Sequence, residues 1–180
     1  LSRYPLANLT FTELQPRAGF YENRVVLHAT AEIPEGPIDL FVTHLTNGRA
    51  AVNEAQAKSL LAFVQTEAKY PAIVAGDFNA VETSVQILWL TERWEDSFRT
   101  ANPTSPGETC CVSDLSDLTS TPFPFERRVD YLFLVPGTKM AIRPVAVVRL
   151  FDMPYETAAG PLWLSDHAGL LATVVLEPHP

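Results

Sequence analysis

The alternation of apolar and polar positions divides the first half of the chain into a hairpin and a helix. Residues 24–33 (RVVLHATAEI) and 38–43 (IDLFVT) are rich in β-branched and apolar residues, and a Pro-Glu-Gly-Pro turn separates them. This pattern predicts two strands of one hairpin. Between residues 50 and 69, apolar positions return at helical spacing without an internal Gly or Pro, so we expect a helix that ends before Pro71.

The rest of the pattern predicts a mixed α/β fold. Residues 72–75 form a short apolar segment, typical of a strand in a sheet covered on both faces. A helix is expected at 82–90, strands at 128–135, 141–148 and 169–176, a long polar surface loop at 101–125 and a second loop at 151–164. Because hairpins outnumber βαβ units, mixed sheets flanked by helices are favoured over a Rossmann fold. Neither G-x-G-x-x-G nor a P-loop is present.

Length and charge narrow the class of protein. With 180 residues, of which 47% are hydrophobic, residues 1–180 are expected to form a single domain. The formal net charge of −8 does not favour nucleic acid as a partner, although a local basic pocket or a metal would reverse the field at one site. The apolar runs are too short to span a membrane. Neither localisation nor oligomeric state is indicated.

The two cysteines are adjacent, at positions 110 and 111. They define no disulfide framework. Adjacent cysteines can close a strained ring, but we expect two free thiols. A thiol enzyme would need a histidine close to Cys110 or Cys111. Both histidine candidates, His44 and His167, are far away in sequence, which disfavours that hypothesis.

Polar side chains stand at the ends of two predicted strands in the first half of the chain. His44 follows the strand at 38–43, either as a surface residue or as a proton carrier or phosphate donor. Asp77 and Asn79 follow the strand at 72–75, after Gly76. They suit either a helix N-cap or a pair that holds and deprotonates a water molecule.

Two further polar groups occur in the second half. Asp130 lies between apolar residues of a predicted strand, where a carboxylate needs a partner. That partner is either Arg127 or Arg128, or a histidine that the acid orients. Asp166 and His167 precede the last strand, as a polar turn or as one metal or water contact and one phosphate contact.

In this order, the segments THL, GDFNA, RVDYLFL and SDHAGLL resemble the endonuclease/exonuclease/phosphatase superfamily, whose fold is DNase I-like. The resemblance implies a four-layer α/β sandwich of mixed sheets flanked by helices. It also implies a metal-dependent phosphoesterase that hydrolyses a phosphodiester or phosphomonoester with an activated water. The substrate would be a phosphate ester, and hard oxygen ligands would favour Mg²⁺ or Mn²⁺ as cofactor.

Roles for individual residues follow from the same resemblance. Asp77 resembles the water-activating acid, and Asn79 the residue that orients the water and a phosphoryl oxygen. His167 resembles the phosphate donor and Asp130 the acid that holds it. His44 resembles a second histidine of some branches. In addition, Asp166 resembles a residue at the metal or its water shell.

Two departures from the family pattern affect this prediction. The sequence begins without Met, and no residue matches the Asn and the metal-binding Glu of the family's N-terminal part, so we expect an N-terminally incomplete domain. Asn53 stands where the family usually has Arg. The alternative hypothesis is therefore a non-catalytic or incomplete domain that acts as a binding module.

Overall fold

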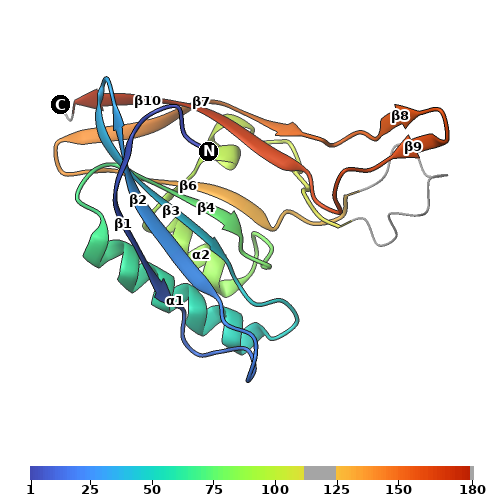
Figure 1. The fold of residues 1–180 in the computed structure, drawn as a ribbon, viewed down its shortest axis with the longest axis horizontal. Helices are drawn as coiled ribbons and strands as arrows, with labels where there is room; N and C mark the ends of the chain where they lie inside the picture. The colour runs from blue at the N-terminus through green and yellow to red at the C-terminus, as the bar shows by residue number, and fades with distance from the viewer. Residues whose placement is uncertain (112–124, 179–180) are drawn as a thin grey trace.

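The computed structural model describes residues 1–111 and 125–178. A six-stranded sheet forms the centre of the molecule (Figure 1). Its strands, in spatial order, are β1 (Leu6–Glu13), β2 (Val25–Ile33), β3 (Gly36–His44), β4 (Ala72–Asp77), β6 (Asp130–Val135) and β5 (Glu95–Asp96).

The direction of the strands follows from their connections. The tight turn between Ile33 and Gly36 makes β2 and β3 an antiparallel hairpin, which confirms the prediction from the sequence. Helix α1 (Ala50–Glu67) carries the chain back across the sheet, so β4 runs parallel to β3. Strand β6 then pairs antiparallel with β4. This topology places the ends of β3 and β4 beside the start of β6.

The hydrophobic core lies between the sheet and the helices α1 and α2 (Val85–Thr91), which cover one face (Figure 1). Phe41, Val74 and Phe133 point from three neighbouring strands toward the helices and are completely buried. Burying large side chains of this kind contributes roughly 2 kcal/mol each. The polar residues at the strand ends therefore lie beside a well-packed core.

The opposite face is covered in part by a ribbon of two long antiparallel strands, β7 (Met140–Leu150) and β10 (Gly169–Pro178) (Figure 1). The short helix α3 (Ser97–Ala101) packs against β7. On β1, β2 and β3 the same face shows a cross-strand row of Phe11, Leu27 and Val42, which are 66%, 52% and 52% exposed. We call this contiguous row the uncovered apolar face of the sheet.

Several predicted boundaries were wrong. The expected loop at 151–164 contains a hairpin of β8 (Tyr155–Thr157) and β9 (Gly160–Leu162), whose residues are largely exposed and so lack the apolar alternation of a buried strand. The expected surface loop at 101–125 begins inside α3, and Thr109 within it is fully buried. Its residues 112–124 lie outside the described part of the chain.

The predicted α/β class is correct. The described residues form one six-stranded sheet, helices on one face and the β7–β10 ribbon. Among the described residues, no helix is both long and apolar enough to cross a membrane.

Candidate active site

Strand register places three of the candidate side chains in one row. His44 is the partner of Asp77 across β3 and β4, and Asp77 is the partner of Asp130 across β4 and β6. Directly opposed residues project from the same face of a sheet. His44 Nε2 lies 3.3 Å from Asp77 Oδ2. The row therefore results from backbone pairing, before any side-chain contact is considered.

Unusual backbone conformations at the end of β4 direct the GDFN segment, residues 76–79, toward the site. Gly76 has φ of 152°, and a Cβ there would collide with the carbonyl oxygen of Thr43. Asn79 has φ of 48°, a left-handed conformation that Asn tolerates better than most residues. Its backbone N–H donates to Asp77 Oδ1 at 2.7 Å, and its side-chain amide donates to the Leu45 carbonyl at 2.9 Å.

These contacts bear on the alternative interpretation of Asp77 and Asn79 as a helix cap. The N-cap of α2 is Ser84, and neither Asp77 nor Asn79 caps that helix. Asn79 instead joins the end of β4 to the end of β3, which holds Asp77 in place.

His167 reaches the row from a distant part of the chain. Its backbone pairs with Cys110 in an isolated bridge, and the next residue, Ala168, donates its N–H to the Thr109 carbonyl at 2.8 Å. His167 Nδ1 lies 2.8 Å from Asp130 Oδ2. A buried segment, 109–110, thus positions the histidine against the acid.

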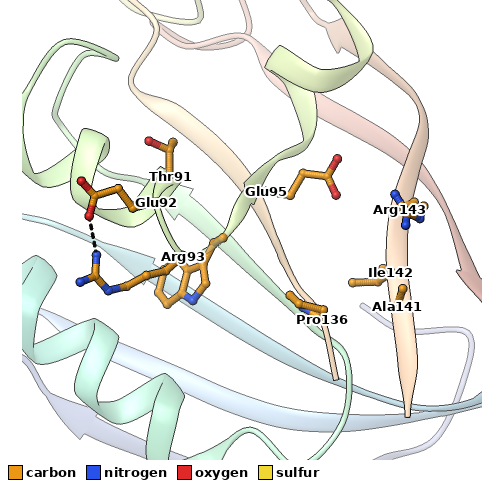
Figure 2. Close-up of a pocket in the computed structure, with 9 residues that line it drawn as sticks. Thr91, Glu92, Arg93, Glu95, Pro136, Ala141, Ile142 and Arg143 are labelled. Atoms are coloured by element: carbon orange, nitrogen blue, oxygen red, sulfur yellow. Dashed lines mark hydrogen bonds and ion pairs between the residues drawn. The ribbon is translucent and has the colours of Figure 1, made fainter. Parts of the chain in front are cut away.

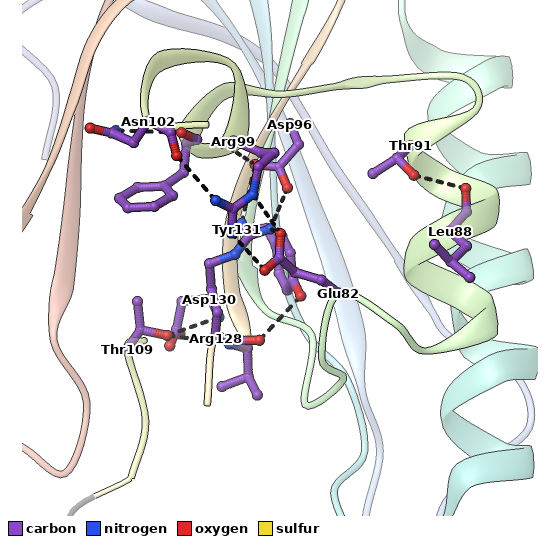
Figure 3. Close-up of polar contacts among 12 residues, drawn as sticks. Glu82, Leu88, Thr91, Asp96, Arg99, Asn102, Thr109, Arg128, Asp130 and Tyr131 are labelled. Atoms are coloured by element: carbon purple, nitrogen blue, oxygen red, sulfur yellow. Dashed lines mark hydrogen bonds and ion pairs between the residues drawn. The ribbon is translucent and has the colours of Figure 1, made fainter. Parts of the chain in front are cut away.

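Asp130 pairs with this histidine, whereas Arg128 has other partners. The Arg128 guanidinium binds Asp96 at 2.6 Å and Glu82 at 2.5 Å, within a network that includes Arg99 (Figure 3). The Asp130 backbone N–H donates to the Thr109 hydroxyl. The carboxylate of Asp130 therefore remains available to orient His167.

The candidate residues line a single cavity of about 550 Å³. Asp166 also lines it but is exposed, with its side chain near Ser165 Oγ. The lining includes three residues that the sequence analysis did not select: Arg24, Asn47 and Cys111. Arg24 could have been found from the hairpin register, since Val26 opposes Thr43 and the preceding residues must lie beside His44.

The charges around the cavity influence one another. Burial raises the pKa of Asp77, and the charge of the neighbouring Asp130 raises it further. The backbone hydrogen bond from Asn79 and the charges of His44 and His167 act in the opposite direction without cancelling the rise. Burial alone would lower the pKa of His167, but the hydrogen bond and charge of Asp130 outweigh it, so the pKa lies above the usual value. The arrangement therefore favours the protonated form of His167 and makes Asp77 harder to ionise than an exposed carboxyl.

The donor set fits a hard divalent cation. Ligand atoms of Asp77, Asp130 and His167 lie within 4.8 Å of one another, and the carboxylate of Asp166 lines the same cavity. Burial is the main cause of the raised pKa of Asp77 and repulsion from Asp130 adds to it; a divalent cation would relieve that repulsion. Carboxylate oxygens are the ligands that Mg²⁺ and Mn²⁺ prefer.

Asn53, on α1, helps to hold two loops that border the site. Its side-chain amide donates to the carbonyls of Thr46 and Phe78, each at 2.8 Å, and its oxygen accepts from the Gln86 amide. Asn53 therefore links the loop after His44 to the loop after Asp77. An asparagine is short enough to make both contacts while fully enclosed.

A second cavity, of about 440 Å³, lies at the other end of β6, between Thr91–Glu95 and Ala141–Arg143 (Figure 2). Several of its charged groups are already paired, Glu92 with Arg93 and Arg143 with Glu177. None of the residues proposed from the sequence lines it. We therefore treat the cavity beside Asp77 as the candidate site.

The expectation of two free thiols was wrong. The structure joins Cys110 and Cys111 in a disulfide, and their Cα atoms are 3.1 Å apart. Cys110 is buried, whereas Cys111 faces the candidate site. Although they are far apart in sequence, Cys110 and His167 are neighbours in the fold, because their backbones form an isolated β-bridge.

The fold and the site define the class of protein. The family model of the endonuclease/exonuclease/phosphatase family matches residues 1–167, and the chain belongs to this family. No curated protein sequence matches the chain.

Solved structures show the same fold. An endonuclease/exonuclease/phosphatase from Beutenbergia cavernae is 25% identical with a TM-score of 0.69, and the match covers 97% of this chain and 46% of that one. A mannosyl-6-phosphatase from Bacteroides thetaiotaomicron is 18% identical with a TM-score of 0.75, covering 96% and 67%. The human Nocturnin catalytic domain with bound sulfate is 22% identical with a TM-score of 0.68, covering 97% and 61%. The chain thus spans about half to two thirds of these relatives.

Proposed function

We propose that this chain carries the water-handling part of a metal-dependent phosphoesterase, a hydrolase that cleaves a phosphodiester or phosphomonoester. The observation that carries the proposal is the row of His44, Asp77 and Asp130, completed by His167 around one cavity. Membership of the phosphoesterase family supports the reaction type.

Each residue has a role that its position allows. Asp77 takes a proton from the attacking water, and its partly buried carboxylate is a stronger base for being desolvated. Asn79 orients that water and a phosphoryl oxygen. His167, protonated and held by Asp130, donates to the phosphate as negative charge develops. His44 stabilises the ionised form of Asp77 from the other side.

The residues around the cavity also fit a bound Mg²⁺ or Mn²⁺. Asp166 at the rim would hold the cation or its water shell, with the carboxylates of Asp77 and Asp130 facing the same space. When bound, the cation would neutralise charge on the phosphate and on the leaving oxygen.

The test is hydrolysis of bis-p-nitrophenyl phosphate by the purified chain, with Mg²⁺ or with EDTA. Asp77→Asn keeps the shape of the side chain and removes the base, so the rate should fall by about 10² or more. Glu54→Gln, on the solvent side of α1, is the matched control and should retain full activity. Hydrolysis that survives both EDTA and Asp77→Asn would disprove the proposal.

A second candidate function is favoured by the uncovered apolar face of the sheet. Phe11, Leu27 and Val42 form an exposed row of a kind that usually contacts another protein surface. The chain also matches only 46% to 68% of the length of the solved chains. Together with the exposed row, this supports the proposal that residues 1–180 are part of a larger single domain. Without the remainder, the chain would act as a binding module. Magnesium-dependent turnover by the 180-residue chain would exclude that alternative.

A further inference from the structure

The cysteine pair and the catalytic-type acids share one histidine. Ligand atoms of Cys110, Cys111 and His167 lie within 4.8 Å of one another, and so do those of Asp77, Asp130 and His167. The same imidazole is therefore a member of two clusters with different donor chemistry. One cluster offers sulfur and nitrogen, and the other offers mainly oxygen.

The cysteines are held at this place by the backbone. The Arg127 N–H donates to the Cys110 carbonyl at 2.7 Å, and the Cys110 N–H donates to the Arg127 carbonyl at 2.9 Å. On its other side, Cys110 pairs with His167. The sulfur atoms consequently stay next to the histidine whether or not they are bonded to each other.

A cation also lies beside the sulfur atoms. Arg127 Nη2 is 3.1 Å from Cys111 Sγ and 4.0 Å from Cys110 Sγ. A neighbouring guanidinium favours the thiolate form of a thiol, which is the form that binds metals. Arg127 is exposed and can turn away when a cation arrives.

We propose that, on reduction, Cys110 and Cys111 join His167 in a binding site for a thiophilic divalent cation such as Zn²⁺, and that this cation withdraws His167 from the phosphoester. Two thiolates and one imidazole are a typical zinc donor set, with a fourth position left for water. In the oxidised protein the disulfide offers no thiolate, so the site exists only after reduction. The cysteine pair is then a redox-gated inhibitory site, in addition to the phosphoesterase site proposed above.

The steps balance chemically. A phosphine reductant supplies two electrons and the S–S bond breaks. One water molecule gives the two protons that complete the thiols and the oxygen with which the phosphine leaves as its oxide. Binding of one Zn²⁺ then forms two Zn–S bonds and one Zn–N bond to His167, and it releases both thiol protons and the imidazolium proton to the buffer.

The test uses the full chain and Zn²⁺ as the probe. One sample is left oxidised, and another is reduced with a phosphine and desalted under nitrogen. A thiol titration should find no thiol in the first and two in the second. Competition with a chromophoric chelator should then show one Zn²⁺ bound at least ~10-fold more tightly by the reduced sample. Two thiols in the unreduced protein, or equal affinities in both samples, would overturn the proposal.

Variants separate the two clusters. Cys111→Ser changes the more accessible sulfur, and in the reduced protein it should weaken Zn²⁺ binding by at least ~10-fold. Asp77→Asn removes no ligand of the thiol cluster and should change that affinity by much less than Cys111→Ser does. Co²⁺ used in place of Zn²⁺ should give sulfur-to-metal charge-transfer absorption that Cys111→Ser reduces. An equal loss of affinity in the two variants, or no such absorption, would assign the cation to the carboxylates instead.

Inhibition is measured separately from binding. One equivalent of Zn²⁺ should lower phosphoester hydrolysis by the reduced protein and leave the oxidised protein at its original rate. This arm rests on the proposed phosphoesterase function, whereas the affinity and absorption measurements do not. A chain that binds Zn²⁺ only when reduced but hydrolyses nothing would therefore refute the proposed function and retain the thiol site.

Discussion

Asp130 Oδ2 lies 2.8 Å from His167 Nδ1, which joins the first residue of β6 to the segment before β10. The contact leaves Nε2 of the histidine as the nitrogen that is free of Asp130. The acid orients the ring, and because it raises the pKa of His167 against the effect of burial, it favours the protonated form. Asp130 therefore acts on the proposed phosphate through the histidine.

Asp130→Asn should lower the pKa of His167 toward its ordinary value, because the amide carries no charge. The alkaline limb of the rate profile should then move to lower pH, and kcat should fall by roughly 10-fold to 10²-fold. An NMR titration of the His167 ring in metal-free protein measures the pKa directly. An unchanged pKa together with full activity would contradict the role assigned to Asp130.

A buried acid on the helix-covered face of the sheet, Asp39, should make the free energy of unfolding depend on pH. Burial opposes ionisation of Asp39, but the contact with His28, the backbone N–H groups of Lys69 and Tyr70, and the Thr30 hydroxyl outweigh it. The pKa of Asp39 in the folded protein therefore lies below its value in the unfolded chain.

The sign of the effect follows from that direction. Asp39 contributes stability at a pH above its unfolded pKa, near 4, and the contribution disappears as the pH falls through the lower folded pKa. The free energies of unfolding in urea of the wild type and of Asp39→Asn should differ strongly at pH 7, and the difference should narrow below about pH 4. A difference that does not change with pH would show that Asp39 acts only through packing.

Part of the site could be predicted from the sequence because it depends on local order. Apolar runs that stop at His44 and at Asp77 place these residues at strand ends. The parallel pairing of β3 with β4 and the antiparallel pairing of β4 with β6 then bring them beside Asp130. Gly76 was recognisable as a residue that allows an unusual backbone conformation, whereas the left-handed conformation of Asn79 was not predicted. The family motifs then indicated which of them belong together.

The remaining features depend on contacts between distant segments. Nothing in the local pattern shows that Cys110 would pair with His167, more than fifty positions later, or that Thr109 would be buried. The side-chain links of Asn53 to two loops were equally invisible, since polar residues on a helix usually face solvent. The exposed hairpin of β8 and β9 lacks the alternation by which strands are recognised.

Gly76 should be the most sensitive glycine near the site. Gly76→Ala combines a backbone conformation that L residues rarely adopt with a collision at the Thr43 carbonyl. We therefore expect the free energy of unfolding to fall by about 3 kcal/mol or more. Gly36→Ala is the matched control, since its φ of 125° is also unfavourable but no atom lies within 4 Å of the added carbon. That variant should lose only about 1–2 kcal/mol in chemical denaturation. Equal losses would exclude the collision as the cause.

Asn53 should matter for stability and for activity, because it holds the loops that carry His44 and Asp77. Asn53→Ala leaves the carbonyls of Thr46 and Phe78 without their amide donors, and should cost about 3 kcal/mol. Asn53→Asp should be worse at neutral pH, since an ionised carboxylate of the same size cannot donate to two carbonyls. Glu54→Ala, the next position on α1, should cost no more than about 0.5 kcal/mol. Denaturant unfolding at pH 7 and pH 5 measures all three variants, and the penalty of Asp over Ala should shrink at the lower pH as the carboxyl becomes protonated. If Asn53→Asp were as stable as the wild type at pH 7, the link between the two loops would not depend on the amide of Asn53.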